Sequence, residues 1–219
     1  LTITIIMTKT KAESCRQQSD GYHRNFPDCP TMTSTELAGM MHQRSLEIYY
    51  KTEDGSPVHL IDVRSVPERR VSIIPGSVSL RNFEKLVAPT LSVDSIVVCY
   101  CTVGYRSGIE CRRLKEKYGL DERVRNLDGV VAYTHAVHEA SRGDGSDGCR
   151  PHLVNGFTGE PCNKVHVFGP QWDCASENYR TIKFSFFTLA THYVQVGFHT
   201  MIRTGQHVSY IIVRALGFT

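Results

Sequence analysis

One stretch of the sequence decides the fold of this chain: Val97-Val98-Cys99-Tyr100-Cys101-Thr102-Val103-Gly104-Tyr105-Arg106-Ser107. Residues 95–100 are almost uninterruptedly apolar, which is typical of a strand that is buried on both faces of a parallel sheet. We expect a loop to follow over residues 101–106, and then a helix from Ser107 to about Tyr118 that Gly119 closes. A buried strand that passes through a short loop directly into a helix indicates an α/β fold.

The sequence on either side repeats this alternation of strand and helix. Thr33 and Glu36 have the spacing of a capping box, and the apolar residues that follow predict a helix over about 34–50. Further strands are expected at 58–63, 78–80, 124–127 and 164–168, and further helices at 82–87 and from Gly129 onwards. The sequence therefore predicts an α/β fold with a central, mostly parallel sheet flanked by helices.

The chain of 219 residues has room for one domain with additional segments. We expect a flexible N-terminal tail over residues 1–32 and the domain itself over 33–140. Residues 141–179 are expected to be a linker and a C-terminal extension that packs on the domain, and residues 180–219 a poorly defined tail. Because the chain begins with Leu1, we expect either a fragment or a true start at Met7.

Composition excludes several classes of protein. With 25 basic and 22 acidic residues the chain is nearly neutral, so we expect no nucleic-acid partner. The apolar stretch 184–202 is interrupted by polar residues, so we expect no membrane span. We expect no signal peptide from the opening residues, and in a long chain the eight cysteines then lead us to expect free thiols in an intracellular reducing compartment, by default the cytoplasm.

Cys101 is the strongest candidate for a chemical role. It lies where a buried strand is expected to end, and at this edge of a parallel sheet ligands usually bind. The loop N–H groups, the start of the next helix and Arg106 all favour a negative charge there, and so favour the nucleophilic thiolate form of Cys101. Gly104 allows the backbone to fold closely around the sulfur.

Four ordered motifs carry a resemblance to a known family. They are Leu60-Ile61-Asp62-Val63-Arg64 with Glu68 four residues later, Ile74-Pro75-Gly76-Ser77, the loop from Cys101 to Ser107, and Asn126-Leu127-Asp128-Gly129 followed by Tyr133. Over about residues 34–140 the chain resembles the rhodanese-domain (thiosulfate sulfurtransferase-like) family, whose loop has the form C-x-x-G-x-R-S. The resemblance implies a single rhodanese-like domain.

The resemblance also implies a function and a set of site residues. Cys101 would take a sulfane sulfur from a small donor such as thiosulfate, hold it as a persulfide and pass it to a thiol or to cyanide. A protein acceptor is an alternative, and we expect a monomer without cofactor or metal. The donor would be bound by Arg64 and by the loop residues Thr102, Val103, Gly104, Tyr105, Arg106 and Ser107, and Asp62 would be structural.

Several alternatives remain open at this level. The related dual-specificity phosphatases and arsenate reductases have five residues between cysteine and arginine, whereas here four separate Cys101 from Arg106. A domain that binds or regulates without turnover is the other alternative function. Arg64 and Asp62 could simply form an ion pair. A zinc site is a further alternative, with ligands drawn from Cys149, His152, Cys162, His166 and Cys174.

Overall fold

The computed structural model describes residues 9–44, 47–140 and 152–184, and the chain up to Ile182 forms the compact unit considered below. Its helices are α1 (Lys11–His23), α2 (Ser34–Gly39), α3 (Val66–Val71), α4 (Leu80–Asn82), α5 (Tyr105–Tyr118) and α6 (Val130–Ala140). Its strands are β1 (Thr31–Met32), β2 (Met41–Arg44), β3 (Glu47–Lys51), β4 (Pro57–Asp62), β5 (Val78–Ser79), β6 (Ile96–Tyr100), β7 (Val124–Leu127), β8 (Lys164–His166) and β9 (Arg180–Ile182). Short helical turns cover Phe83–Val87, Ala88–Thr90, Asp121–Arg123 and Pro170–Trp172.

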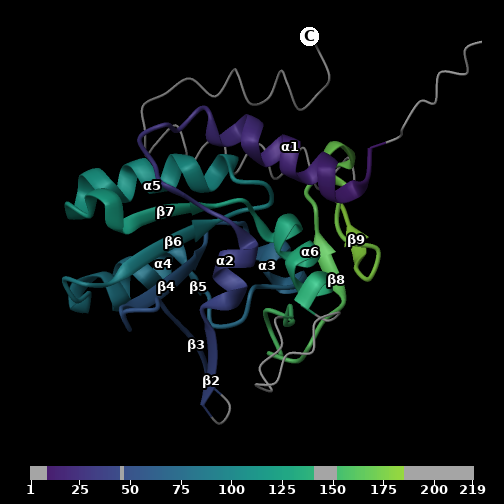
Figure 1. Ribbon diagram of the computed structural model, residues 1–219. Coiled ribbons are helices and arrows are strands. Elements are labelled where there is room, and N and C mark those ends of the chain that lie inside the picture. The colour runs from purple at the N-terminus through teal and green to yellow at the C-terminus, as the bar shows by residue number, and fades with distance from the viewer. Residues whose placement is uncertain (1–8, 45–46, 141–151, 185–219) are drawn as a thin grey trace, which may run out of the picture. The chain divides into compact units, whose positions relative to one another are not determined.

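A central sheet organises the described residues, with helices packed on it (Figure 1). Its strand order is β1-β7-β6-β4-β3-β2, and β5 also pairs with β4. The pairs β1–β7, β7–β6, β6–β4 and β4–β5 are parallel, whereas β4–β3 and β3–β2 are antiparallel. This confirms the expected α/β fold with a mostly parallel central sheet. Strands β8 and β9 form a separate parallel pair.

Strand β6 is buried on both of its faces, as the apolar run of its sequence predicts. Val98 and Tyr100 belong to one core cluster together with residues of α2, α6 and the segment 153–175. Val97 and Cys99 belong to a second cluster together with residues of α5 and Phe83. Alternate residues of a strand point to opposite faces, so the two clusters lie on the two sides of the sheet.

The predicted helix over 34–50 is wrong beyond Gly39. Thr33 and Glu36 do form the capping box that starts α2. After Gly39, however, the chain forms β2 and β3 and joins the sheet through β4. Tyr50 is buried and its hydroxyl donates a hydrogen bond to the carbonyl of Pro75 at 3.0 Å. Pairing with β4 therefore outweighs the helical spacing of the local sequence.

The predicted N-terminal tail is also wrong for residues 9–32. A capping box between Thr10 and Glu13 begins α1, and Met32 in β1 pairs with Leu127 of the sheet. Cys15 and Phe26 are buried in the two core clusters. The sequence signal is weak because α1 buries only a narrow strip of small residues, and a helix of that kind is stabilised mainly by packing.

The C-terminal segment 152–182 packs on the same domain. Leu153, Val165 and Ala175 lie fully buried in the first core cluster. Residues 180–182, which we expected to lie in a poorly defined tail, form β9. Residues 1–8, 141–151 and 185–219 lie outside the described part, and with them the expected linker, Met7 and most of the apolar stretch 184–202. Among the helices of the described residues, none is both long enough and apolar enough to span a membrane.

Candidate functional site

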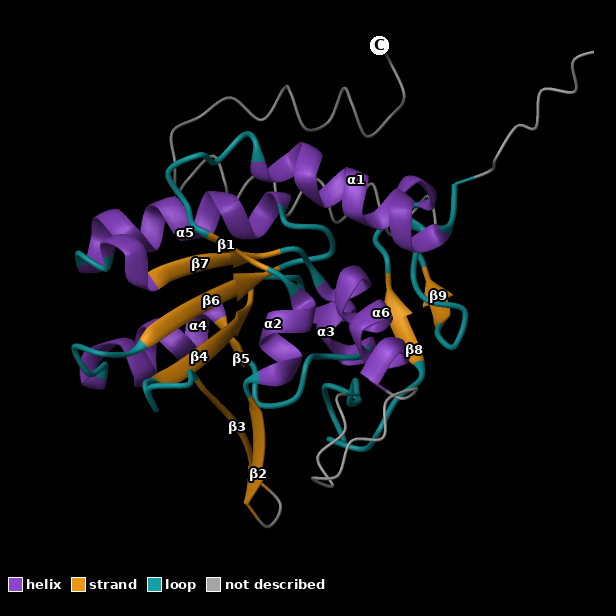
Figure 2. Cartoon of the chain, in the orientation of Figure 1, coloured by secondary structure: helices purple, strands orange, loops and turns teal. Residues whose placement is uncertain are grey.

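Cys101 lies at the carboxyl edge of the parallel strands. It directly follows β6, and Figure 2 shows the arrowheads of β4, β6 and β7 at one edge of the sheet. Helix α5 begins at Tyr105, and Gly104 before it has a φ of 93°. That left-handed conformation strongly favours glycine, and it turns the chain from the strand into the helix. The first N–H groups of a helix have no partner within it, so those of α5 are directed toward the loop.

Neighbouring elements hold the backbone of the loop. The N–H of Val130, at the start of α6, donates to the carbonyl of Cys101 at 2.9 Å. The amide of Asn126 in β7 donates to the carbonyl of Gly104 at 2.9 Å. Gly129 has a φ of 116°, and a Cβ there would lie 2.4 Å from the carbonyl oxygen of Thr102. This close approach fixes the loop against the turn between β7 and α6.

The thiol of Cys101 is buried inside the loop. Only 1% of the residue is exposed, and the hydroxyl of Ser107 donates to its sulfur at 3.5 Å. The loop residues Thr102 and Val103 are buried as well. Among the predicted residues from Thr102 to Ser107, the structure places Ser107 in contact with the sulfur of Cys101, whereas Thr102 and Arg106 are bonded to each other.

Arg106 binds a carboxylate of the same chain. Its guanidinium donates two hydrogen bonds to Glu68, at 2.6 and 2.8 Å, and a third to the hydroxyl of Thr102 at 2.9 Å. Burial raises the pKa of Glu68, but Arg106 and Arg64 more than reverse this, so its pKa is well below the usual range. Glu68 also accepts from the N–H and hydroxyl of Ser65 at the start of α3. Arg106 therefore ties the loop to α3.

Arg64 does not take the position that we expected of a donor-binding residue. Its guanidinium donates to Asp62 at 2.7–3.2 Å and to the carbonyl of Ser72 at 2.6 Å, and its side chain has no exposed surface. Asp62 also accepts from the hydroxyl of Tyr100 at 2.7 Å. The alternative of an Arg64–Asp62 ion pair is confirmed, and as a fully buried, paired guanidinium Arg64 presents no exposed surface.

Two segments distant in sequence cover the outer side of the loop. From α1, the hydroxyl of Ser19 donates to the carbonyl of Asp128 and lies 3.4 Å from the carbonyl oxygen of Val103, and a Cβ on Gly104 would lie only 2.7 Å from Nε2 of His23. From the C-terminal segment, the ring of Phe168 lies 5.0 Å from the guanidinium of Arg106. We call α1 and residues 164–176 the covering segments.

Two titratable groups beside the loop have altered pKa values. Burial raises the pKa of Asp128 to about 6, although hydrogen bonds from the N–H and hydroxyl of Ser34 partly oppose this. Burial also lowers the pKa of His23, with partial opposition from the carbonyl of Leu127. At neutral pH the His23 imidazole beside Gly104 is therefore mainly uncharged.

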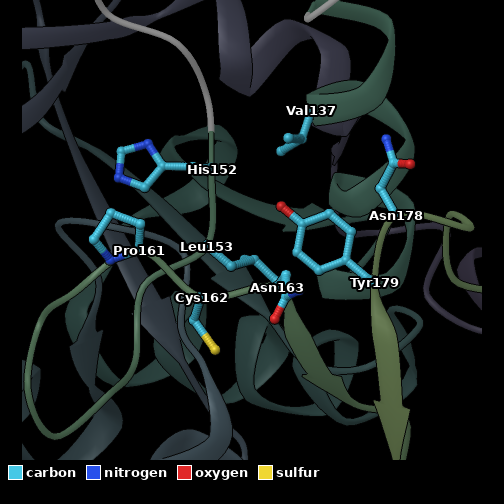
Figure 3. A pocket seen from close by; sticks show the side chains of 8 residues that line it. All are labelled: Val137, His152, Leu153, Pro161, Cys162, Asn163, Asn178 and Tyr179. Atoms are coloured by element: carbon cyan, nitrogen blue, oxygen red, sulfur yellow. The ribbon is translucent and has the colours of Figure 1, made fainter.

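A surface pocket of about 380 Å³ lies apart from the loop (Figure 3). It is lined by Val137, His152, Leu153, Pro161, Cys162, Asn163, Asn178 and Tyr179, and none of these is a loop residue. Figure 3 shows the sulfur of Cys162 directed away from His152, so the two do not form a nucleophile–base pair. Because neither Cys101 nor a residue of its loop lines this pocket, the pocket is separate from the Cys101 site.

The alternative zinc site is not assembled in the described residues. Cys149 lies outside them, and within 9–44, 47–140 and 152–184 no group of three or more His, Cys, Asp or Glu side chains could hold a metal ion. His166 instead accepts a hydrogen bond from the N–H of Phe168 at 3.0 Å.

Sequence reasoning missed the covering segments and the partner of Arg106. Glu68 could have been found, because Ser65 and Glu68 have the spacing of a capping box and so place a carboxylate at the start of a helix. Ser19, His23 and Phe168 carry no such signal, because their relation to the loop depends on contacts between distant parts of the chain.

The central part of the chain is similar to a known protein family and to solved structures. Residues 45–133 match the family model of the rhodanese-like domain. A rhodanese-like domain protein from Staphylococcus aureus is 20% identical, with 48% of this chain and 90% of that chain covered and a TM-score of 0.35. A protein from Staphylococcus saprophyticus is 23% identical, covering 48% and 92% with a TM-score of 0.34. A protein of unknown function from Rhodopseudomonas palustris, described as a possible tyrosine phosphatase, is 20% identical, covering 62% and 96% with a TM-score of 0.35. No curated protein matches the chain.

Proposed function

Because residues 45–133 form a rhodanese-like domain, we propose that the protein is a sulfurtransferase that uses Cys101 as its nucleophile. It moves a sulfane sulfur from a small anionic donor such as thiosulfate to a thiol, to cyanide or to a protein acceptor. The observation that carries the proposal is the position of the Cys101 sulfur, which lies beside the Ser107 hydroxyl in the loop that leads into the N-terminus of α5.

The reaction has two balanced steps. The Cys101 thiolate attacks the outer sulfur of thiosulfate, the S–S bond of thiosulfate breaks, and sulfite leaves with the electron pair. Cys101 then carries a persulfide. In the second step a nucleophilic acceptor attacks the terminal sulfur of the persulfide, and the Cys101 thiolate leaves and is regenerated.

The residues around Cys101 suit a singly charged sulfur. The Ser107 hydroxyl donates to the sulfur at 3.5 Å, and the helix N-terminus favours negative charge at the same place. Four residues separate Cys101 from Arg106, which makes a small ring of N–H groups. Arg106 is bound to Glu68, which offsets its charge, and a dianionic phosphate is therefore less well matched than a persulfide.

Intact mass measurement tests this function directly. After incubation with thiosulfate we expect a gain of about 32 Da, one sulfur atom, that is lost on addition of cyanide. Cys101→Ser should abolish the gain. Cys99→Ser is the matched control, because Cys99 precedes Cys101 by two residues yet is buried against α5, and it should retain the gain.

Two results would overturn the proposal. One is a sulfur gain that persists in Cys101→Ser, which would move the reactive thiol elsewhere. The other is wild-type protein that hydrolyses aryl phosphates but gains no sulfur, which would assign the loop to phosphate chemistry.

A further inference from the structure

One face of α1 is paired with the C-terminal covering segment. Cys15, Gln18 and Tyr22 are spaced three and four residues apart, and so lie on one side of the helix. The amide of Gln18 donates to the carbonyl of Gln171 at 3.0 Å, and the indole N–H of Trp172 donates to the hydroxyl of Tyr22 at 3.0 Å. Figure 1 shows the two segments side by side.

Two thiols lie within this contact. Cys15 of α1 and Cys174 are both buried in the same core cluster, and both are free. The two thiols influence each other's pKa: Cys174 raises the pKa of Cys15, and Cys15 lowers the pKa of Cys174. They belong to one core cluster beneath the hydrogen-bonded contact of α1 with residues 171–172, and the thiol with the lowered pKa loses its proton more readily, as thiol oxidation requires.

The same helix holds the loop of Cys101. The hydroxyl of Ser19, one turn after Cys15, donates to the carbonyl of Asp128 and lies 3.4 Å from the carbonyl oxygen of Val103 in the loop. The ring of Tyr22 packs on the ring of Tyr105 with centroids 5.5 Å apart. Cys101 is only 1% exposed, so a reagent reaches its sulfur only when part of the structure around the loop moves.

We propose that Cys15 and Cys174 form a reversible disulfide that locks the covering segments over the Cys101 loop. The oxidant class is a hydroperoxide such as hydrogen peroxide. The two thiols lose two protons and two electrons and form the S–S bond, while the O–O bond of the peroxide breaks to give two waters. A dithiol reductant reverses the step by exchange and unlocks the cover.

We call this disulfide the lock. Its formation does not depend on the proposed function, and only its effect does: if Cys101 transfers sulfur, closing the site would stop that transfer. Its test therefore uses alkylation of Cys101 by iodoacetamide, which needs no sulfur transfer. The full-length reduced protein is treated with limiting hydrogen peroxide, alkylated under native conditions, and mapped by peptide mass.

We expect a Cys15–Cys174 linked peptide, about 2 Da lighter than the two thiol peptides together, which accounts for two hydrogen atoms. We also expect Cys101 to be alkylated at least about tenfold more slowly after oxidation, with the rate restored by dithiothreitol, because the open state becomes rarer. In Cys15→Ser and in Cys174→Ser the peroxide should no longer slow the alkylation of Cys101.

Cys29→Ser is the matched control. Cys29 is another buried thiol of the N-terminal segment, but it packs with Cys111 on the opposite side of the sheet, so this variant should keep the lock. A linkage that maps to Cys29 and Cys111, oxidation of Cys101 itself, or an unchanged alkylation rate in the presence of the Cys15–Cys174 disulfide would each overturn the proposal. If instead the disulfide forms and slows alkylation but reduced protein gains no sulfur from thiosulfate, the lock stands and the proposed function fails.

Discussion

Replacing Glu68 with glutamine isolates the ion pair that holds the Cys101 loop. Glu68→Gln keeps the size of the side chain but removes its charge. The partly buried guanidinium of Arg106 then loses its carboxylate partner at 2.6 Å. Thr102 remains as a neutral partner, and the N–H at the start of α3 loses a charged acceptor.

The expected cost follows from the burial of the pair. Removing one partner of a fully buried ion pair costs about 3–5 kcal/mol. Glu68 is fully buried, but 25% of the Arg106 side chain is exposed, so water hydrates part of the released charge. We therefore expect Glu68→Gln to lower the free energy of unfolding by about 2–4 kcal/mol at pH 7.

The pH dependence has a definite sign. The pKa of Glu68 is lower in the folded protein than in the unfolded chain. Its ionised form therefore adds stability above the unfolded pKa, about 4.3, and this contribution is lost as the pH falls toward the lower folded pKa. The stability difference between wild type and Glu68→Gln should be largest at neutral pH and should shrink below about pH 4.3.

Urea unfolding between pH 3 and pH 7 measures both quantities. Asp28→Asn is the control, since Asp28 forms an exposed pair with Arg112 whose loss should cost at most about 1 kcal/mol. The reasoning would be refuted if Glu68→Gln cost no more than Asp28→Asn, or if the difference did not shrink in acid.

Two further predictions concern the turns on either side of the site. Gly104→Ala should lower the free energy of unfolding by about 1–3 kcal/mol, because alanine is strained at a φ of 93° and its Cβ meets His23. In urea unfolding, adding His23→Ala to Gly104→Ala should recover the part of the lost free energy that is due to the clash. A Gly104→Ala variant as stable as the wild type would contradict this prediction. Asp128→Asn tests a pKa that folding raises to about 6: the carboxyl adds stability in acid, and this is lost as the pH rises through about 6. As the pH falls from 7 to 4, the free energy of unfolding of the wild type should therefore rise by about 2–3 kcal/mol relative to that of Asp128→Asn. Parallel pH profiles of the two unfolding free energies would refute this prediction.

Local sequence signals are sufficient to predict the framework of the site. The apolar run of β6, the glycine in the loop and the capping glycine after α5 are local signals, and they predict the strand, the turn and the helix that place Cys101 at the edge of the sheet. The same applies to the start of α2, where the capping box of Thr33 and Glu36 is satisfied within four residues. Short-range hydrogen bonds and burial on both faces leave a clear pattern in the chain.

The surroundings of Cys101 depend on contacts between distant segments of the folded chain. The pairing of Arg106 with Glu68 and the burial of Arg64 depend on where separate strands and helices end in space. The cover over the loop joins α1 to residues 164–176, which are far apart in sequence. Such contacts follow no period along the chain, because the ion pairs and hydrogen bonds join segments that are far apart in sequence, and the role of these side chains therefore emerges only once the chain is folded.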